Sequence, residues 1–80
     1  MDRQMEYSVF QYFLDGSYER LAELVPMDDA VKIAYGCISS IGGRIGTTVR
    51  VIITDDGDEC CFEWIFEKGI TFPPELAAGK

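Results

Sequence analysis

The sequence contains no histidine, and its 80 residues include only one tryptophan and three prolines. Histidine is the commonest general base and the commonest zinc ligand, so its absence removes the usual centre of most hydrolase and metal chemistries. No apolar run approaches the roughly 20 residues that a bilayer-spanning helix needs. The opening residues, Met1 to Glu6, are too polar for a secretory signal.

Positive charge is also scarce, because 7 Lys and Arg stand against 14 Asp and Glu and leave a net charge of −7. Such a balance argues against a surface that neutralises phosphates or binds anionic lipid. Three cysteines, an odd number, fit reduced thiols better than a disulfide framework. We therefore expect a cytoplasmic protein with no nucleic-acid partner, no membrane partner and no cofactor.

The length allows one small domain, and a hydrophobic share of 48% makes it globular. We expect residues 1–80 to form this domain, with an N-terminal tail at 1–6 and an extended C-terminal tail at 72–80. A chain this short buries only about 60% of the surface that its unfolded form exposes. Small domains often gain support from a partner subunit, so self-association is expected.

The first part of the chain reads as a β-hairpin, with strands at Tyr7–Leu14 and Tyr18–Val25 around an Asp-Gly-Ser turn. A two-residue loop would place Phe10 opposite Leu21, whereas a three-residue loop would shift every pair. The pattern leaves this register open. Both alternate sets of the first strand are apolar: they are Phe10, Tyr12 and Leu14, and Tyr7, Val9 and Phe13.

A helix is predicted next, with Pro26 at its first position and two aspartates in its first turn. Gly42-Gly43 is expected to end it, and Gly36 within it to mark a close contact with the sheet. The apolar stripe at three- and four-residue spacing comprises Met27, Ala30, Val31, Ala34, Cys37, Ile38 and Ile41.

Asp56-Gly57 predicts a second hairpin with a two-residue turn, which fixes the strand partners by counting outward. The expected pairs facing the helix are Ile53 with Cys60, Val51 with Phe62 and Val49 with Trp64. On the other face they are Arg50 with Glu63 and Ile52 with Cys61. The last strand is expected to close by Thr71, because Phe72-Pro73-Pro74 cannot continue a ladder.

The predicted fold class is therefore α+β with the order ββαββ: a four-stranded, mainly antiparallel sheet with one helix packed on one face. One helix covers one face, yet the sheet has more apolar positions than one face can hold. A second copy of the chain, the C-terminal tail or a ligand must cover the other face, and we favour a second copy. The candidate interface residues are Tyr7, Val9, Phe13, Ile52, Ile65 and Phe72.

Motifs that carry chemistry are few. Cys60-Cys61 is adjacent on a strand, so Cys60 is expected in the core near Cys37, with Cys61 facing away, rather than in a metal site. The acidic run 55–59 lacks the ligand spacing of an EF-hand and reads as a hairpin tip. The glycine-rich stretch 42–46 follows a helix, which argues against a phosphate loop. No catalytic or metal residue is assigned.

Three segments, YSVFQYFLDGSYERLAELV, GTTVRVIITDDGD and EWIFEKGITFPPE, together resemble small orphan proteins of bacteria, including those carried as mobile gene cassettes in integrons. The resemblance covers the chain from Tyr7 to Glu75. It implies a bacterial cytosolic protein that is often oligomeric, and it assigns no functional residue.

The leading functional hypothesis is a non-enzymatic interaction or ligand-binding module, a homodimer formed through the uncovered sheet face or a sheet edge. Its partner is a second copy, a protein or a small cationic ligand. The alternative is an acidic inhibitor or mimic that occupies a basic site on another bacterial protein. An enzyme would need groups such as Tyr12, Glu19, Arg50 and Glu63 in one cleft, and no motif brings them together.

Overall fold

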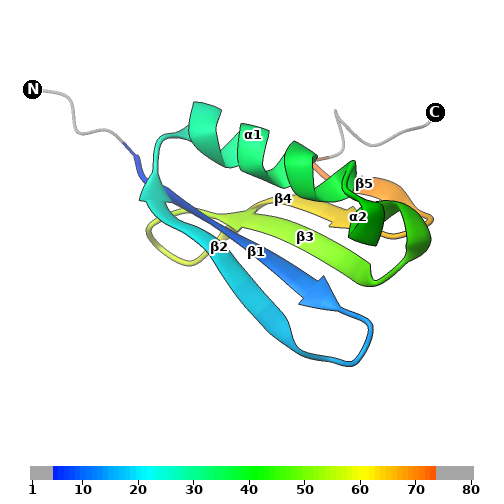
Figure 1. Cartoon of the computed structure of the whole chain (residues 1–80). Coiled ribbons are helices and arrows are strands. Elements are labelled where there is room, and N and C mark those ends of the chain that lie inside the picture. The colour runs from blue at the N-terminus through cyan, green and yellow to red at the C-terminus, as the bar shows by residue number, and fades with distance from the viewer. Residues whose placement is uncertain (1–4, 74–80) are drawn as a thin grey trace, which may run out of the picture.

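The computed structural model describes residues 5–73, which form a five-stranded antiparallel sheet with a helix along one face (Figure 1). The α+β prediction is confirmed, but these residues hold five strands and two helices instead of four and one. The sheet order is β2-β1-β3-β4-β5. The elements are β1 Tyr7–Phe13, β2 Tyr18–Val25, α1 Met27–Ile38, α2 Ile41–Ile45, β3 Thr48–Thr54, β4 Cys60–Ile65 and β5 Gly69–Phe72.

The core lies between α1 and the middle strands of the sheet. Two alanines of α1, Ala30 and Ala34, are fully buried, and their small side chains allow the helix backbone to lie close to the strands. The helix begins at Met27, with Pro26 as its extended N-cap and not as its first residue, contrary to the prediction. Asp28 and Asp29 lie in the first turn, where the helix dipole favours negative charge. The buried core residues are Val9, Ala30, Ala34, Val51, Ile53, Phe62 and Trp64.

The β1–β2 hairpin turns through three residues, which settles the register that the sequence leaves open. The amide of Phe13 donates to the Ser17 carbonyl at 2.8 Å, and Gly16 is left-handed with φ 93°. A left-handed residue at this point is typical of a three-residue loop. Phe10 therefore pairs with Arg20.

The predicted register of the second hairpin is wrong by two residues over most of its length. Its loop also has three residues, because Asp58, with φ 66°, takes the left-handed conformation after Gly57. A bulge then separates the pairs Thr54–Cys60 and Ile53–Phe62. Val51 consequently pairs with Trp64, Arg50 with Ile65 and Ile52 with Glu63.

The last predicted strand is in fact two strands. The chain turns through residues 66–68, with the Lys68 amide donating to the Ile65 carbonyl at 2.9 Å, and returns as β5. Left-handed conformations at Glu67 and Gly69 make this turn possible. Phe72 belongs to β5 and pairs with Glu63, so the sheet continues into the predicted tail. The rest of that tail, 74–80, and residues 1–4 lie outside the described residues.

The helical region also ends differently from the prediction. α1 stops at Ile38, and Gly42-Gly43 lies within α2, where a Cβ at Gly43 would lie 2.3 Å from the Ile38 carbonyl oxygen. Gly43 therefore allows α2 to fold back onto the end of α1. The glycine that ends a helix is Gly46, with φ 94°. Ile41, predicted on the buried stripe, is 75% exposed.

Gly36 makes no close contact, contrary to the prediction. It is exposed, and a Cβ built on it meets no atom within 4 Å. No close contact with the described residues therefore requires a glycine at this position.

We predict that Gly36→Ala raises the free energy of unfolding by about 0.5–1 kcal/mol, because alanine loses less conformational entropy in a helix. Urea denaturation followed by circular dichroism measures the change. Gly46→Ala is the matched control and should lower stability, since its Cβ would lie 2.8 Å from the Phe66 ring. A Gly36→Ala variant less stable than the wild type would contradict this account.

Candidate functional site

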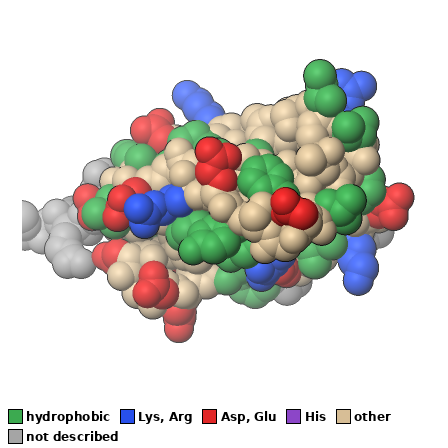
Figure 2. Space-filling model, turned by 60° about the horizontal axis from the view of Figure 1, so that its bottom comes forward, with side chains coloured by type: hydrophobic (Ala, Val, Ile, Leu, Met, Phe, Trp, Pro, Cys, Tyr) green, Lys and Arg blue, Asp and Glu red, His purple; other side chains and the backbone are tan. Residues whose placement is uncertain are grey.

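The candidate site is the open face, defined as the face of the sheet opposite α1. Because paired residues of an antiparallel sheet point to the same side, the register assigns these positions directly. Figure 2 views the molecule from this side and shows hydrophobic side chains with acidic and basic ones between them. The open-face residues are Phe10, Tyr12, Tyr18, Arg20, Arg50, Ile52, Glu63, Ile65 and Phe72.

A polar network crosses the middle of the open face and connects four strands. Arg50 Nε donates to Glu63 Oε2 at 2.6 Å, and the Thr71 hydroxyl donates to Glu63 Oε1 at 2.7 Å. The Arg50 guanidinium lies over the Tyr12 ring, 5.1 Å from its centroid. The hydrogen bond from Thr71 and the Arg50 guanidinium hold the pKa of Glu63 below its ordinary value, against the effect of burial. The Arg50–Glu63 contact predicted from the sequence is confirmed, as a diagonal pair.

Aromatic rings extend this network toward the β2 edge. The Tyr18 ring lies 5.5 Å from that of Tyr12 and 6.2 Å from that of Phe10, centroid to centroid. Ile52 is only 7% exposed although no helix covers it. Part of the apolar surface of the open face is therefore already buried within the single chain.

A hollow of about 330 Å³ opens on the β4–β5 side of the open face. Its lining combines a charged pair, a hydroxyl, a thiol and an aromatic ring. The lining residues are Arg50, Cys60, Glu63, Thr71 and Phe72.

The six predicted interface residues do not all lie on this face. The placement of Tyr7 and Val9 there is wrong, because Val9 is fully buried beneath α1 and Tyr7 packs against the same core. Ile52, Ile65 and Phe72 do lie on the open face. Phe13 is half-buried at the end of β1.

The predicted faces of β1 are reversed in the structure, and periodicity does not distinguish between them. Both alternate sets are apolar, so only the pairing with β3 decides: Val9 pairs with Ile53 of the core, and Phe10 with Ile52. Thr71 is a site residue that the sequence pattern does not indicate, whereas Tyr12 is among the cleft groups considered from the sequence. Thr71 reaches Glu63 because β4 and β5 form a hairpin. The only feature of the sequence that indicates this turn is Gly69.

The cysteines also differ from expectation. Cys60 is exposed and lines the hollow on the open face. The bulge beside it changes which side chains of β4 point to each face. Cys37 contacts Gln11 instead: its thiol donates to Gln11 Oε1 at 2.8 Å. Burial raises the pKa of the Cys37 thiol and of the Cys61 thiol, which keeps both protonated and weakly nucleophilic.

Gln11 organises a second polar group on the helix side of the sheet. Its carbonyl oxygen also accepts from the buried Thr48 hydroxyl at 3.0 Å, and its amide donates to Glu19 at 2.9 Å. Glu19 therefore lies away from the open face, whereas Tyr12, Arg50 and Glu63 come together on it.

The acidic loop is organised as a turn. One carboxylate oxygen of Asp55 accepts from the amides of Gly57 and Glu59 at 2.8 and 3.0 Å. Within residues 5–73, no group of three or more Cys, Asp or Glu side chains is placed to hold a metal ion. The part of the chain that the structure describes also contains no helix long and apolar enough to cross a membrane.

Comparison with protein-family models, curated proteins and solved structures finds no match to this chain. The resemblance to small orphan bacterial proteins therefore stays a prediction. The open face is defined by the chain's own contacts alone.

We predict that the stabilising effect of Glu63 depends on pH. Because the folded-state pKa lies below the ordinary 4.5, the Glu63 carboxylate stabilises the fold above that pH and loses its effect as the pH falls through the folded value. Glu63→Gln should therefore cost about 0.5–1 kcal/mol at neutral pH, a small value because the pair is partly exposed.

Urea denaturation from about pH 7 to pH 3 measures the stability difference between wild type and Glu63→Gln. This difference should shrink below about pH 4.5. Glu67→Gln, which removes an exposed carboxylate outside the network, controls for the loss of one negative charge. A difference that stays constant over the whole range would show that the network does not stabilise the carboxylate.

Proposed function

We propose that this protein is a non-enzymatic interaction module that associates through its open face, and that the partner is a second copy of the chain. The observation that carries the proposal is an aromatic face whose described charged groups are paired, on a chain of net charge −7. The free thiols of all three cysteines support a reducing, cytoplasmic setting.

Charge is balanced on the open face. Arg50 lies 2.6 Å from Glu63, and Arg20 lies 3.4 Å from Glu23. Two such faces can approach without the repulsion that the net charge would otherwise produce, because the surplus acids lie in turns and at the helix start. Those acids include Asp15, Asp28, Asp29, Asp58, Glu59 and Glu67.

The area of the open face is sufficient for a weak dimer. Five strands about 4.8 Å apart and about six residues long give a face of roughly 24 Å by 20 Å, or about 500 Å². Two copies would bury about 1,000 Å², which is the lower limit for a specific interface. We therefore expect a dissociation constant in the micromolar range or weaker.

The sheet edges are less suited to pairing than the face. β2 carries bulged pairing with β1, a left-handed Leu24 and the charged Arg20 and Glu23. β5 has four residues and is followed by Pro73. Bulges, charges, short strands and proline are the features that protect edges from adding another strand.

The acidic-inhibitor alternative draws less support from the structure. The carboxylate of Asp55 is used within its own turn, and that of Asp15 accepts from the amide and hydroxyl of Ser17. Acids that organise turns are less available to imitate the phosphates of another ligand.

Sedimentation equilibrium of the wild type and two Tyr→Ser variants tests the proposal. The 9.0 kDa chain should approach twice this mass as its concentration rises. Tyr18→Ser, which alters the open face, should weaken the dimer by about tenfold or more, as loss of an aromatic contact at an interface does.

Tyr35→Ser is the matched control, because Tyr35 is 45% exposed on α1 and Tyr18 is 62% exposed on the open face. It should leave the dissociation constant within about twofold of the wild type, since a residue outside an interface contributes little to binding. A wild type that stays monomeric at millimolar concentration, or an equal effect of both variants, would contradict the proposal.

A further inference from the structure

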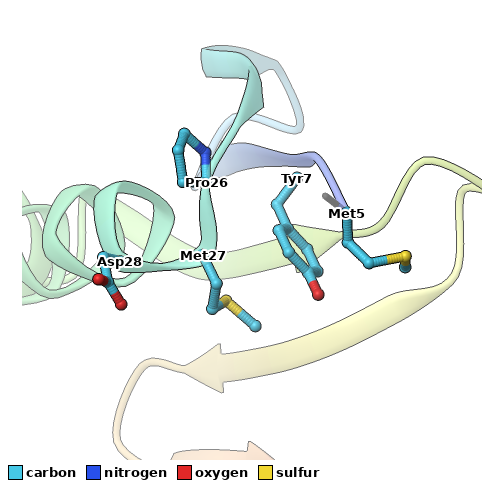
Figure 3. Close-up of a pocket in the computed structure, with 5 residues that line it drawn as sticks. All are labelled: Met5, Tyr7, Pro26, Met27 and Asp28. Atoms are coloured by element: carbon cyan, nitrogen blue, oxygen red, sulfur yellow. The ribbon is translucent and has the colours of Figure 1, made fainter. Parts of the chain in front are cut away.

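A second hollow lies at the start of α1, away from the network of the open face. It has a volume of about 280 Å³ and lies where the beginning of β1 meets the beginning of the helix. Figure 3 shows the side chains of Met5, Tyr7 and Met27 projecting the same way from these two segments. Pro26 and Asp28 complete the lining, and we call this site the methionine hollow.

The methionine side chains give the hollow an apolar and adaptable part of its wall. Met5 is 47% exposed and Met27 37% exposed. Thioether side chains are flexible and polarizable, so they fit apolar groups of different shapes. The Tyr7 ring adds an aromatic face against which an apolar group can pack.

The charged group of the methionine hollow is the Asp28 carboxylate, which has no ion-pair partner among residues 5–73. Asp28 is exposed. Asp29 follows it, and Glu6 lies between Met5 and Tyr7. The helix N-terminus offsets about half a charge, so the surroundings remain negative and disfavour anions.

We infer that the methionine hollow binds a small organic ammonium ion that carries one apolar group. The apolar group would pack against the methionines and Tyr7, and the ammonium would face Asp28. The volume corresponds to about nine water molecules at about 30 Å³ each, which suits a small amine better than a folded partner. The inference does not depend on the proposed dimer, because no residue that lines the methionine hollow belongs to the open face.

The test is a titration of the full chain, labelled with ¹³C at its methionine methyl groups, with 2-phenylethylammonium chloride. The chain has three methionines, so the spectrum is simple, and Leu variants of Met5 and Met27 assign the signals. Both signals should shift and saturate in the millimolar range, as expected for a small ligand in an open site. Neutral 2-phenylethanol and anionic phenylacetate should bind at least about threefold more weakly, because they lack the cation.

Asp28→Asn should weaken ammonium binding by about threefold or more, as loss of an opposite charge does at an exposed site. Asp29→Asn removes the same charge one residue further along, outside the lining, and should change binding by less than about twofold. Equal binding of the ammonium ion and the alcohol, equal effects of both variants, or unshifted Met5 and Met27 signals would each overturn the inference.

Discussion

The packing of α1 on the central strands is the interaction on which the rest of the structure depends. Ala30 and Ala34 lie against a face formed by Val9, Val51 and Ile53, and these residues are almost completely removed from water. Burial of a valine or isoleucine side chain contributes about 1.5–3 kcal/mol, which makes this layer the main source of stability. α1 has 12 residues and lies on one face of the sheet, so it buries the apolar side chains of that face only (Figure 1).

The second face is stabilised in a different way. Arg50 and Glu63 pair across β3 and β4, and the guanidinium also lies over Tyr12. Ile52 on this face is only 7% exposed, whereas Tyr18 and Phe72 are 62% and 42% exposed. A face that is apolar, neutral and partly covered is stable in the monomer, and association would bury more of its apolar surface. This combination connects the fold to the proposed dimer.

The sequence predicts the position of the helix and an antiparallel sheet beside it, although with four strands instead of five. The Arg50–Glu63 contact forms although the predicted direct pairing is wrong, because a shift of two residues leaves the two side chains as diagonal neighbours on the same face. The sequence does not predict the hairpin registers, because an Asp-Gly pair fits loops of two or three residues and the choice depends on which residue becomes left-handed: Gly16 in one hairpin and Asp58 in the other. The faces of β1 are equally undetermined, since Val9 and Phe10 are both apolar. Their sides follow only from the pairing with β3, a contact between distant segments.

Solvent accessibility of the two faces, measured at low and high protein concentration, tests the central claim most directly. A neutral gadolinium chelate in solution increases the NMR relaxation rates of exposed side chains. Our account predicts that this effect falls for Tyr12, Tyr18 and Phe72 as the concentration rises, while it stays constant for Tyr35 on α1. An effect on the open face that is the same at both concentrations would show that this face remains in water and would contradict the account.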